Sequence, residues 1–278
     1  ILRNEIGAVE SDELLASSII SKKIASGASN IIIDVKYGSG AFMKTPEDAV
    51  ALSRLIINVG KILGKSITAV VTSMEEPLGR AVGNSLEVVE AIEFLKGNLD
   101  NGDLAEVTYS IAAMTLLQLD LYDNITEASA YLKTLVHSGK ALEKFRELII
   151  AQGGAAEVID NYDKFVLPCY KVECESKKNG YIQNVNAYNV SCALKALGAA
   201  RENSSKPIDL SVGIFLNKKS GEYVKKGETL YTIYSNNEDA TKIAQRYCDD
   251  AFSINEARPS HNNLIYKIIS TKDEDDNV

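Results

Sequence analysis

The chain has 278 residues and a formal net charge of -8 at pH 7, a length that buries a core and usually forms one large or two smaller domains. The acidic balance and the lack of a basic stripe with interleaved aromatic residues argue against a nucleic-acid-binding protein. No apolar run approaches the roughly 20 residues that span a bilayer, and no secretory signal opens the chain. We therefore expect a cytoplasmic protein without a membrane or nucleic-acid partner.

The first predicted element is a helix over roughly residues 12–26. Ser11 can cap its start, and Gly27 supplies a left-handed stop. Ser18 and Lys22 are four residues apart and therefore share one face of this helix. By spacing alone, such a pair is typical of a solvated helix surface.

A strand-helix-strand unit follows. Residues 31–36 include three consecutive isoleucines, and such an apolar run is typical of a strand buried on both faces of a parallel sheet. The run ends at Gly38-Ser39-Gly40, which suits a ligand-binding turn at the carboxyl end of a strand but also serves as a tight turn without a ligand. A helix over 46–64 and a strand over 67–72 complete the unit.

Residues 77–84 form an irregular, glycine-rich loop, and a helix over 85–95 follows. Glu90 lies on this helix, and from pattern alone it is one more exposed carboxylate. His137 lies near the end of a later helix, where a cation suits the helix dipole, and we interpret it as structural. Three helices are predicted in this region, over 104–121, 125–138 and 141–152.

From about residue 170 the pattern changes to short strands separated by glycine or asparagine turns. The stretch 209–236 resembles a barrel-sandwich module of the biotinyl or lipoyl kind. Its lysine pairs, Lys218-Lys219 and Lys225-Lys226, lack the neighbours of a carrier lysine, so no attached cofactor is expected. The predicted strands are 170–175, 180–185, 209–216, 222–224, 230–234 and 264–269, with helices over 187–197 and 237–250.

The cysteines do not form a metal-binding pattern. The four of them are scattered without a Cys-x-x-Cys pair, and only two histidines could join them. A zinc site is therefore not expected. We expect these thiols to act as small apolar residues in a reducing cytosol.

Three stretches are specific enough to resemble a known family. They are Arg3–Lys23, the motif DVKYGSGAFMKTPEDA beginning at Asp34, and the motif EEPLGRAVGNSLEVVEAI beginning at Glu75. In order and spacing they resemble thymidine phosphorylase and pyrimidine-nucleoside phosphorylase, and the similarity continues to the C-terminus. The sequence departs from the family at Ala200, where glycine is usual, and at Tyr234, where histidine is common. The family's Lys-x-Ser and Gly-Gly-Thr phosphate-binding segments lie upstream of this region, and this sequence contains neither.

The resemblance implies roles for particular residues. Arg3, Ser18 and Lys22 would contact the pyrimidine base, and Arg3 and Lys22 would act as catalytic residues on the departing base. Donors at this position stabilise the negative charge that develops on the base as the glycosidic bond breaks. The resemblance also implies an apolar wall of the base pocket, for which a core role is an equal alternative: Val9, Leu15 and Phe42.

A monovalent cation is a further implication. In some family members the carbonyls at the positions of Leu78 and Ala81 and the carboxylate at Glu90 bind such an ion, and hard oxygen ligands suit it. The remaining ligands belong to the upstream segment, so these three positions form only part of a site for K+, which is the one cofactor that the resemblance implies. No organic cofactor is expected.

The implied fold is α/β: a large α/β lobe with a C-terminal β-rich, barrel-sandwich-like module and a remnant of a small helical lobe. The corresponding domains are 1–28 for the helical remnant, 29–168 for the α/β domain and 169–278 for the C-terminal module. The start at Ile1 rather than at a methionine is expected of a fragment or a processed chain. Family members are homodimers through the helical lobe.

The implied function is phosphorolysis of a pyrimidine nucleoside (thymidine, uridine or deoxyuridine) to the free base and a pentose 1-phosphate, in nucleoside salvage. The expected partners are therefore a pyrimidine nucleoside, phosphate and, in the intact protein, a second copy of the chain. Two alternatives stay open. One is a non-catalytic folded fragment of such an enzyme, and the other is a phosphoribosyltransferase related by fold.

Overall fold

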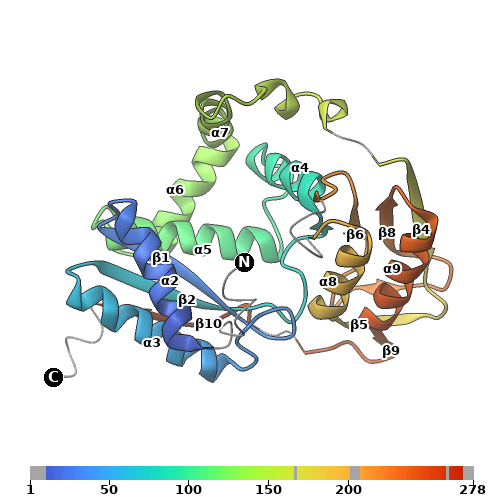
Figure 1. Ribbon diagram of the computed structural model, residues 1–278, viewed down its shortest axis with the longest axis horizontal. Coiled ribbons are helices and arrows are strands. Elements are labelled where there is room, and N and C mark those ends of the chain that lie inside the picture. The colour runs from blue at the N-terminus through green and yellow to red at the C-terminus, as the bar shows by residue number, and fades with distance from the viewer. Residues whose placement is uncertain (1–10, 166–167, 201–206, 261–262, 272–278) are drawn as a thin grey trace. The chain divides into compact units, whose positions relative to one another are not determined.

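The chain forms two compact units, each built from segments that lie far apart in the sequence (Figure 1). The α/β unit comprises Ile1–Met74, Glu106–Leu132 and Asn263–Val278, and the β-rich unit comprises Glu75–Ala105 and Lys133–Asn262. Both mix helices with strands, which confirms the predicted mixed α/β class. The division into 1–28, 29–168 and 169–278 stays a prediction. The computed structural model describes residues 11–165, 168–200, 207–260 and 263–271.

A three-stranded sheet in the order β1-β2-β10 forms the centre of the α/β unit (Figure 1). Strands β1 (Asn30–Tyr37) and β2 (Ser66–Ser73) run parallel, and helix α3 (Pro46–Ile62) connects them. Strand β10 (Ile265–Ser270) pairs antiparallel with β2. The predicted strand-helix-strand unit is therefore confirmed, and a strand from the far end of the sequence extends its sheet.

The two parallel strands differ in burial. Strand β2 is buried from Ile67 to Thr72 because it has a paired strand on each side. In β1 only Ile31 and Val35 are fully buried, so the expectation of a strand buried on both faces is wrong for β1. The reason is the alternation of side chains along a strand, which sends Asp34 and Lys36 to the opposite face.

Helices α2 (Asp12–Ala25) and α3 pack together in the core of the α/β unit. Helix α3 begins with a capping box, in which Thr45 Oγ1 accepts from the Asp48 amide and the Asp48 carboxylate accepts from the Thr45 amide. Helix α2 buries Ala16 and Ile20 in the same apolar core as Ile31, Val35 and the buried face of α3. Burial of this apolar surface fixes α2 beside the sheet.

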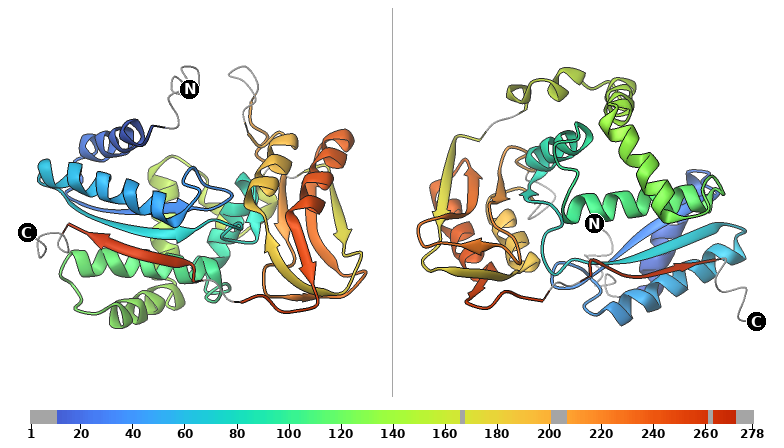
Figure 2. Two further views of the ribbon diagram at one scale, coloured as in Figure 1. Left: turned by 90° about the horizontal axis from the view of Figure 1, so that it is seen from below. Right: turned by 180° about the vertical axis from the view of Figure 1, so that it is seen from behind.

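Helix α5 (Asp103–Gln118) lies on the side of the sheet opposite α3 (Figure 2). Its last residue, Gln118, donates from Nε2 to the carbonyl of Ser66 at 2.8 Å and so joins the helix to the start of β2. Helix α6 (Ile125–His137) follows. No helix of the described residues is long and apolar enough to cross a membrane.

The first part of the β-rich unit is helical. It contains α4 (Asn84–Leu95), α7 (Lys140–Ala151) and two short 3-10 helices, η1 (Ala156–Ile159) and η2 (Tyr162–Lys164). Helix α7 ends at glycine: Gly153 has a φ of 76°, and the amide of Gly154 donates to a carbonyl of the last turn.

A polar cluster joins α4 to η2. The Tyr162 hydroxyl donates to Glu93 Oε1, and Lys96 Nζ donates to the Tyr162 oxygen at 2.8 Å and to Glu93 at 3.2 Å. Asn98 donates to the second Glu93 oxygen at 2.7 Å. The hydrogen bond from Tyr162 holds the pKa of Glu93 below its ordinary value of 4.5, chiefly by stabilising the carboxylate.

Replacing Tyr162 with phenylalanine is expected to lower the free energy of unfolding by about 1 kcal/mol at pH 7. A carboxylate with a lowered pKa contributes stability that is present above its ordinary pKa and is lost as the pH falls through the folded value. The difference between the two proteins in urea unfolding should therefore shrink when the pH falls below about 4. A difference that stayed constant from pH 7 to pH 3 would contradict a role for the Glu93 carboxylate.

The second part of the β-rich unit holds two antiparallel sheets and two helices. The four-stranded sheet has the order β3 (Ala81–Val82), β6 (Gly213–Leu216), β8 (Thr229–Ser235) and β4 (Tyr170–Glu175). The three-stranded sheet has the order β7 (Tyr223–Val224), β5 (Gly180–Val185) and β9 (Phe252–Asn255). The helices are α8 (Ala187–Ala196) and α9 (Glu238–Ala251).

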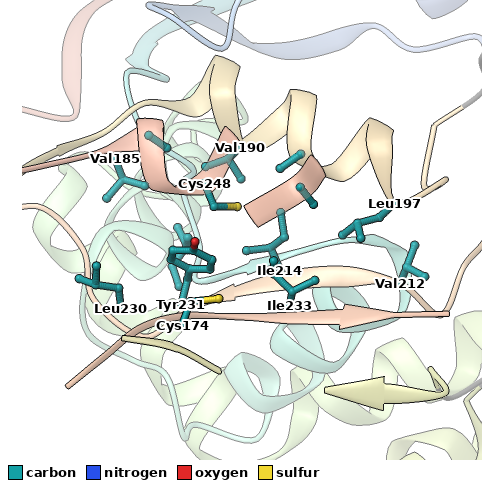
Figure 3. Packing of buried hydrophobic residues seen from close by; sticks show 14 of the residues in the cluster. Cys174, Val185, Val190, Leu197, Val212, Ile214, Leu230, Tyr231, Ile233 and Cys248 are labelled. Atoms are coloured by element: carbon teal, nitrogen blue, oxygen red, sulfur yellow. The ribbon is translucent and has the colours of Figure 1, made fainter. Parts of the chain in front are cut away.

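The core of this part lies between the strands and the two helices (Figure 3). The fully buried ring of Tyr231 extends from β8 toward Cys248 on α9, and its hydroxyl donates to Asp249 Oδ1 at 2.6 Å. Burial raises the pKa of the Cys174 and Cys248 thiols. Both thiols are therefore protonated at neutral pH and pack as small apolar groups, as predicted. The prediction does not hold for Cys169, which is exposed, and Cys192 is half-buried.

Candidate functional site

Helix α2 carries the first group of candidate residues. Ser11 caps it by accepting from the Leu14 amide at 3.3 Å, and Asp12 and Glu13 occupy the first turn. Two lysines, Lys22 and Lys23, occupy the last turn. The acidic start and basic end both suit the helix dipole, so the sequence strongly favours this helix.

Ser18 and Lys22 lie on successive turns of α2. Ser18 is half-buried and Lys22 is exposed. No residue in the described ranges forms an ion pair or hydrogen bond with the Lys22 ammonium, so its charge is not neutralised within that part of the chain. This combination of a hydroxyl and a free cation on one helix face can bind a polar, electron-rich ligand.

Of the other predicted base-contacting residues, the structure describes only Leu15 and Phe42. Leu15 is half-buried and packs against the core of the α/β unit, whereas the Phe42 side chain is 69% exposed in the loop after β1. Arg3 and Val9 lie outside the described residues. An exposed phenyl ring is free to cover an apolar ligand, but contact of any of these residues with a base stays a prediction.

The loop after β1 is held by its own backbone. The Gly38 amide donates to the carbonyl of Met43 at 3.0 Å, and the Gly40 amide donates to the carbonyl of Met74, just beyond β2, at 3.1 Å. Lys44 Nζ donates to the carbonyl of Ala41 at 2.7 Å. The loop that presents Phe42 is therefore fixed at the carboxyl ends of both parallel strands, the edge where open α/β sheets bind ligands.

Three polar side chains meet on the face of the sheet near this edge. Lys36 Nζ lies 2.7 Å from both Asp34 Oδ2 and Thr72 Oγ1, and Thr72 Oγ1 donates to Asp34 Oδ1. The parallel register places Lys36 directly opposite Thr72, which is fully buried. Each charge has its partner, so the three residues make a neutral, rigid group under the loop.

A second group of candidates lies in the β-rich unit, at the loop before α4. Glu90 Oε1 on α4 accepts from the amides of Arg80 at 2.7 Å and Ala81 at 3.3 Å. A Cβ at Gly79 would lie 2.0 Å from Glu90 Oε2, so the glycine leaves room for this carboxylate in its present position. Glu90 is therefore an anchor of the loop and not the exposed helical carboxylate that its pattern suggests.

Lys219, between β6 and β7, supports the same loop. Its side chain is only 9% exposed, and Nζ donates to the carbonyl of Leu78 at 2.9 Å and to the Asp103 carboxylate. Glu76 Oε1 lies 3.8 Å away. Leu78, Asp103 and Lys219 border a cavity of about 220 Å³ that is also lined by Arg80 and Glu222.

Comparison with known proteins finds a family match in each of two parts of the chain. Residues 10–142 match the Glycosyl transferase family, a/b domain, and residues 181–255 match the Pyrimidine nucleoside phosphorylase C-terminal domain. The pyrimidine-nucleoside phosphorylase of Staphylococcus aureus (strain USA300) is 42% identical over 269 residues, and that of Staphylococcus epidermidis (strain ATCC 12228 / FDA PCI 1200) is 41% identical. The chain belongs to the pyrimidine-nucleoside phosphorylase family.

The match covers the two sequences unequally. In both relatives it spans 97% of this chain but 61% of the relative's own length. The family assignment therefore applies to the residues compared.

Two of the three groups implied as ligands of a monovalent cation already have hydrogen-bond partners within this chain. A bound cation needs oxygens that face it with free electron pairs, but Glu90 Oε1 already accepts two amide protons. The Leu78 carbonyl accepts from an ammonium group, that of Lys219. Protein donors thus already face Glu90 Oε1 and the Leu78 carbonyl, while cation binding at the Ala81 carbonyl stays a prediction.

Sequence reasoning missed two of these groups. Asp34 and Lys36 lie two apart after an apolar run, so the alternation of a strand alone could have placed both on one face. Lys219 gave no such signal, because its neighbours are polar and its burial depends on β6 and β7 folding against the loop before α4. Among the described residues, no three His, Cys, Asp or Glu side chains could together hold a metal ion.

Proposed function

We propose that this chain supplies the pyrimidine-binding part of an enzyme that splits pyrimidine nucleosides with phosphate. The products would be the free base and a pentose 1-phosphate. The observation that supports this proposal most directly is the exposed Lys22, which has no ion-pair partner among the described residues and shares a helix face with Ser18. The chain that carries it is 42% identical to a pyrimidine-nucleoside phosphorylase.

In this reaction a phosphate oxygen attacks the anomeric carbon while the bond from that carbon to the base nitrogen breaks. The electron pair of the broken bond goes to the base and spreads onto its carbonyl oxygens, and the base then takes up a proton. Lys22 and Ser18, together with Arg3, would donate to those oxygens. Such donors accelerate the reaction because they bind the charged leaving group more strongly than the neutral nucleoside.

The sugar carbon passes through an oxocarbenium-like state, so the enzyme needs alignment of phosphate and nucleoside more than a protein nucleophile. Leu15, Phe42 and Val9 would form the apolar wall that holds the base in this alignment. The rigid loop after β1 supports this role because its backbone hydrogen bonds fix the position of Phe42.

The proposal also includes a division of the chain into domains. Residues 1–28 would be the remnant of a helical lobe, 29–168 the α/β domain and 169–278 a barrel-sandwich-like module. The two antiparallel sheets around one core support the last assignment. A homodimer through the helical lobe is the proposed assembly of the intact protein.

The test is release of uracil or thymine from uridine, thymidine and deoxyuridine, followed by chromatography with and without phosphate. Base release is expected only with phosphate, together with an equal amount of pentose 1-phosphate. Release that is as fast without phosphate would show hydrolysis and overturn the proposal. The ratio of rates for the three nucleosides would define the substrate preference.

The alternative is a folded module without catalytic activity of its own. It is favoured by the lack of the family's Lys-x-Ser and Gly-Gly-Thr phosphate-binding segments in this sequence. Assays of this chain and, where the reading frame extends upstream, of the extended chain distinguish the two. Activity of the extended chain alone would support the alternative for the residues described, while inactivity of both would contradict phosphorolysis.

A further inference from the structure

The Lys219 ammonium is surrounded by oxygen atoms. Its side chain is 9% exposed, and a lysine this buried requires compensation of its charge. The compensation comes from the Leu78 carbonyl at 2.9 Å, the Asp103 carboxylate and the more distant Glu76 carboxylate at 3.8 Å. Two segments of the β-rich unit thus converge on one positive charge that a third segment carries.

This arrangement performs the structural task of a bound monovalent cation. Such an ion joins a backbone carbonyl to acidic side chains by attracting their oxygens, and a primary ammonium group does the same through its three N–H donors. Unlike an ion in solution, the ammonium is attached to the chain between β6 and β7. It therefore loses little further entropy when it binds the loop.

The remainder of the loop is also held by protein donors and acceptors. Arg80 Nη1 donates to the carbonyl of Asn217 at 3.1 Å, and the Arg80 guanidinium forms an ion pair with Glu222. The same carboxylate accepts from the Lys219 amide at 2.9 Å. Together with the two amides on Glu90, these contacts bind the loop from several sides without an added ion.

We propose that the Lys219 ammonium takes the place of a monovalent cation at the Leu78 carbonyl, so that the loop of residues 78–81 is held without potassium. The inference is independent of the proposed phosphorolysis, because it concerns the structure of the loop. Its test accordingly measures thermal unfolding and hydrogen exchange of the purified chain.

The unaltered chain is compared in potassium chloride and in choline chloride at equal ionic strength. The expected Tm is the same in both salts, and the Arg80 and Ala81 amides should exchange equally slowly. A saturable rise in Tm or in the protection of these amides with potassium would show a site for the ion beside Lys219. That result would overturn the proposal.

Lys219→Met removes the ammonium. The Tm should fall by roughly 5–10 °C in choline chloride, and the Arg80 and Ala81 amides should exchange about tenfold faster. Potassium should recover part of both losses, because the vacated carbonyl and carboxylates can then bind the ion. If this variant kept the slow exchange of the two amides, or had equal Tm values in the two salts, the proposal that the ammonium takes the place of a cation would be contradicted. If this variant does not fold, the comparison of the unaltered chain in potassium chloride and choline chloride still tests the proposal.

Lys218→Met is the matched control. Lys218 lies in the same turn, and its Nζ donates to the carbonyl of Tyr223 at 3.2 Å and to Glu228 at 3.3 Å. Among the described residues its ammonium forms no hydrogen bond or ion pair with the Leu78 loop, so its loss should leave the exchange of the Arg80 and Ala81 amides and the response to potassium unchanged. If both substitutions changed the exchange of these amides equally, the change would come from the general loss of a positive charge. That result would overturn the proposal.

Discussion

Replacing Lys22 with alanine is expected to lower kcat/KM for uridine or thymidine about 100-fold in the enzyme that shows phosphorolysis. The ammonium would be lost from the position where negative charge develops on the departing base. Because that charge is largest in the transition state, kcat should fall more than KM rises. Steady-state rates at saturating phosphate, measured over a range of nucleoside concentrations, separate the two.

Lys23→Ala is the matched control. Lys22 and Lys23 are both exposed and both lie in the last turn of α2, so their favourable interaction with the helix dipole is similar. They point in directions about 100° apart around the helix, and only Lys22 shares a face with Ser18. Equal losses of activity in the two variants would show that the effect comes from reduced helix stability. An unchanged rate for Lys22→Ala would show that Ser18 and Lys22 are only part of a solvated helix surface.

The fold could be predicted from the sequence where local signals were strong. The capping residue Thr45 and the proline after it define the start of α3, and the glycine and asparagine turns define β4 and β5 at their observed bounds. The two-residue strand β3 and the four-residue strand β9 were missed, because such short segments carry no periodicity of their own.

The pairing of β10 with β2 could not be predicted from either segment. Residues 264–269 were expected to form a strand, but its partner lies almost 200 residues earlier and is chosen by tertiary packing. The same limit separates the two candidate groups of the site. Ser18 and Lys22 lie on one helix, so their spacing in the sequence was sufficient to predict that they share a face. Lys219 and Leu78 meet only through the fold of the β-rich unit.

Replacing Gly83 with alanine is expected to lower the free energy of unfolding by about 3 kcal/mol. Gly83 has a φ of 136°, which residues with a side chain rarely adopt, and an added Cβ would lie 2.6 Å from the carbonyl oxygen of Val212 and 2.8 Å from the Cα of Gly213. These are backbone atoms of the segment that enters β6, so they cannot yield by changing a rotamer. The loss should be measured by urea unfolding at pH 7.

Gly27→Ala separates this close approach from backbone strain alone. Gly27 also has a positive φ, 79°, but an added Cβ there meets no atom within 4 Å, so we expect a loss of only about 1 kcal/mol. Gly83→Ala should in addition speed hydrogen exchange at the Arg80 and Ala81 amides, because Gly83 holds the end of their loop against β6. Equal losses in the two variants, with those amides unchanged, would mean that the contact between Gly83 and Gly213 does not support the loop.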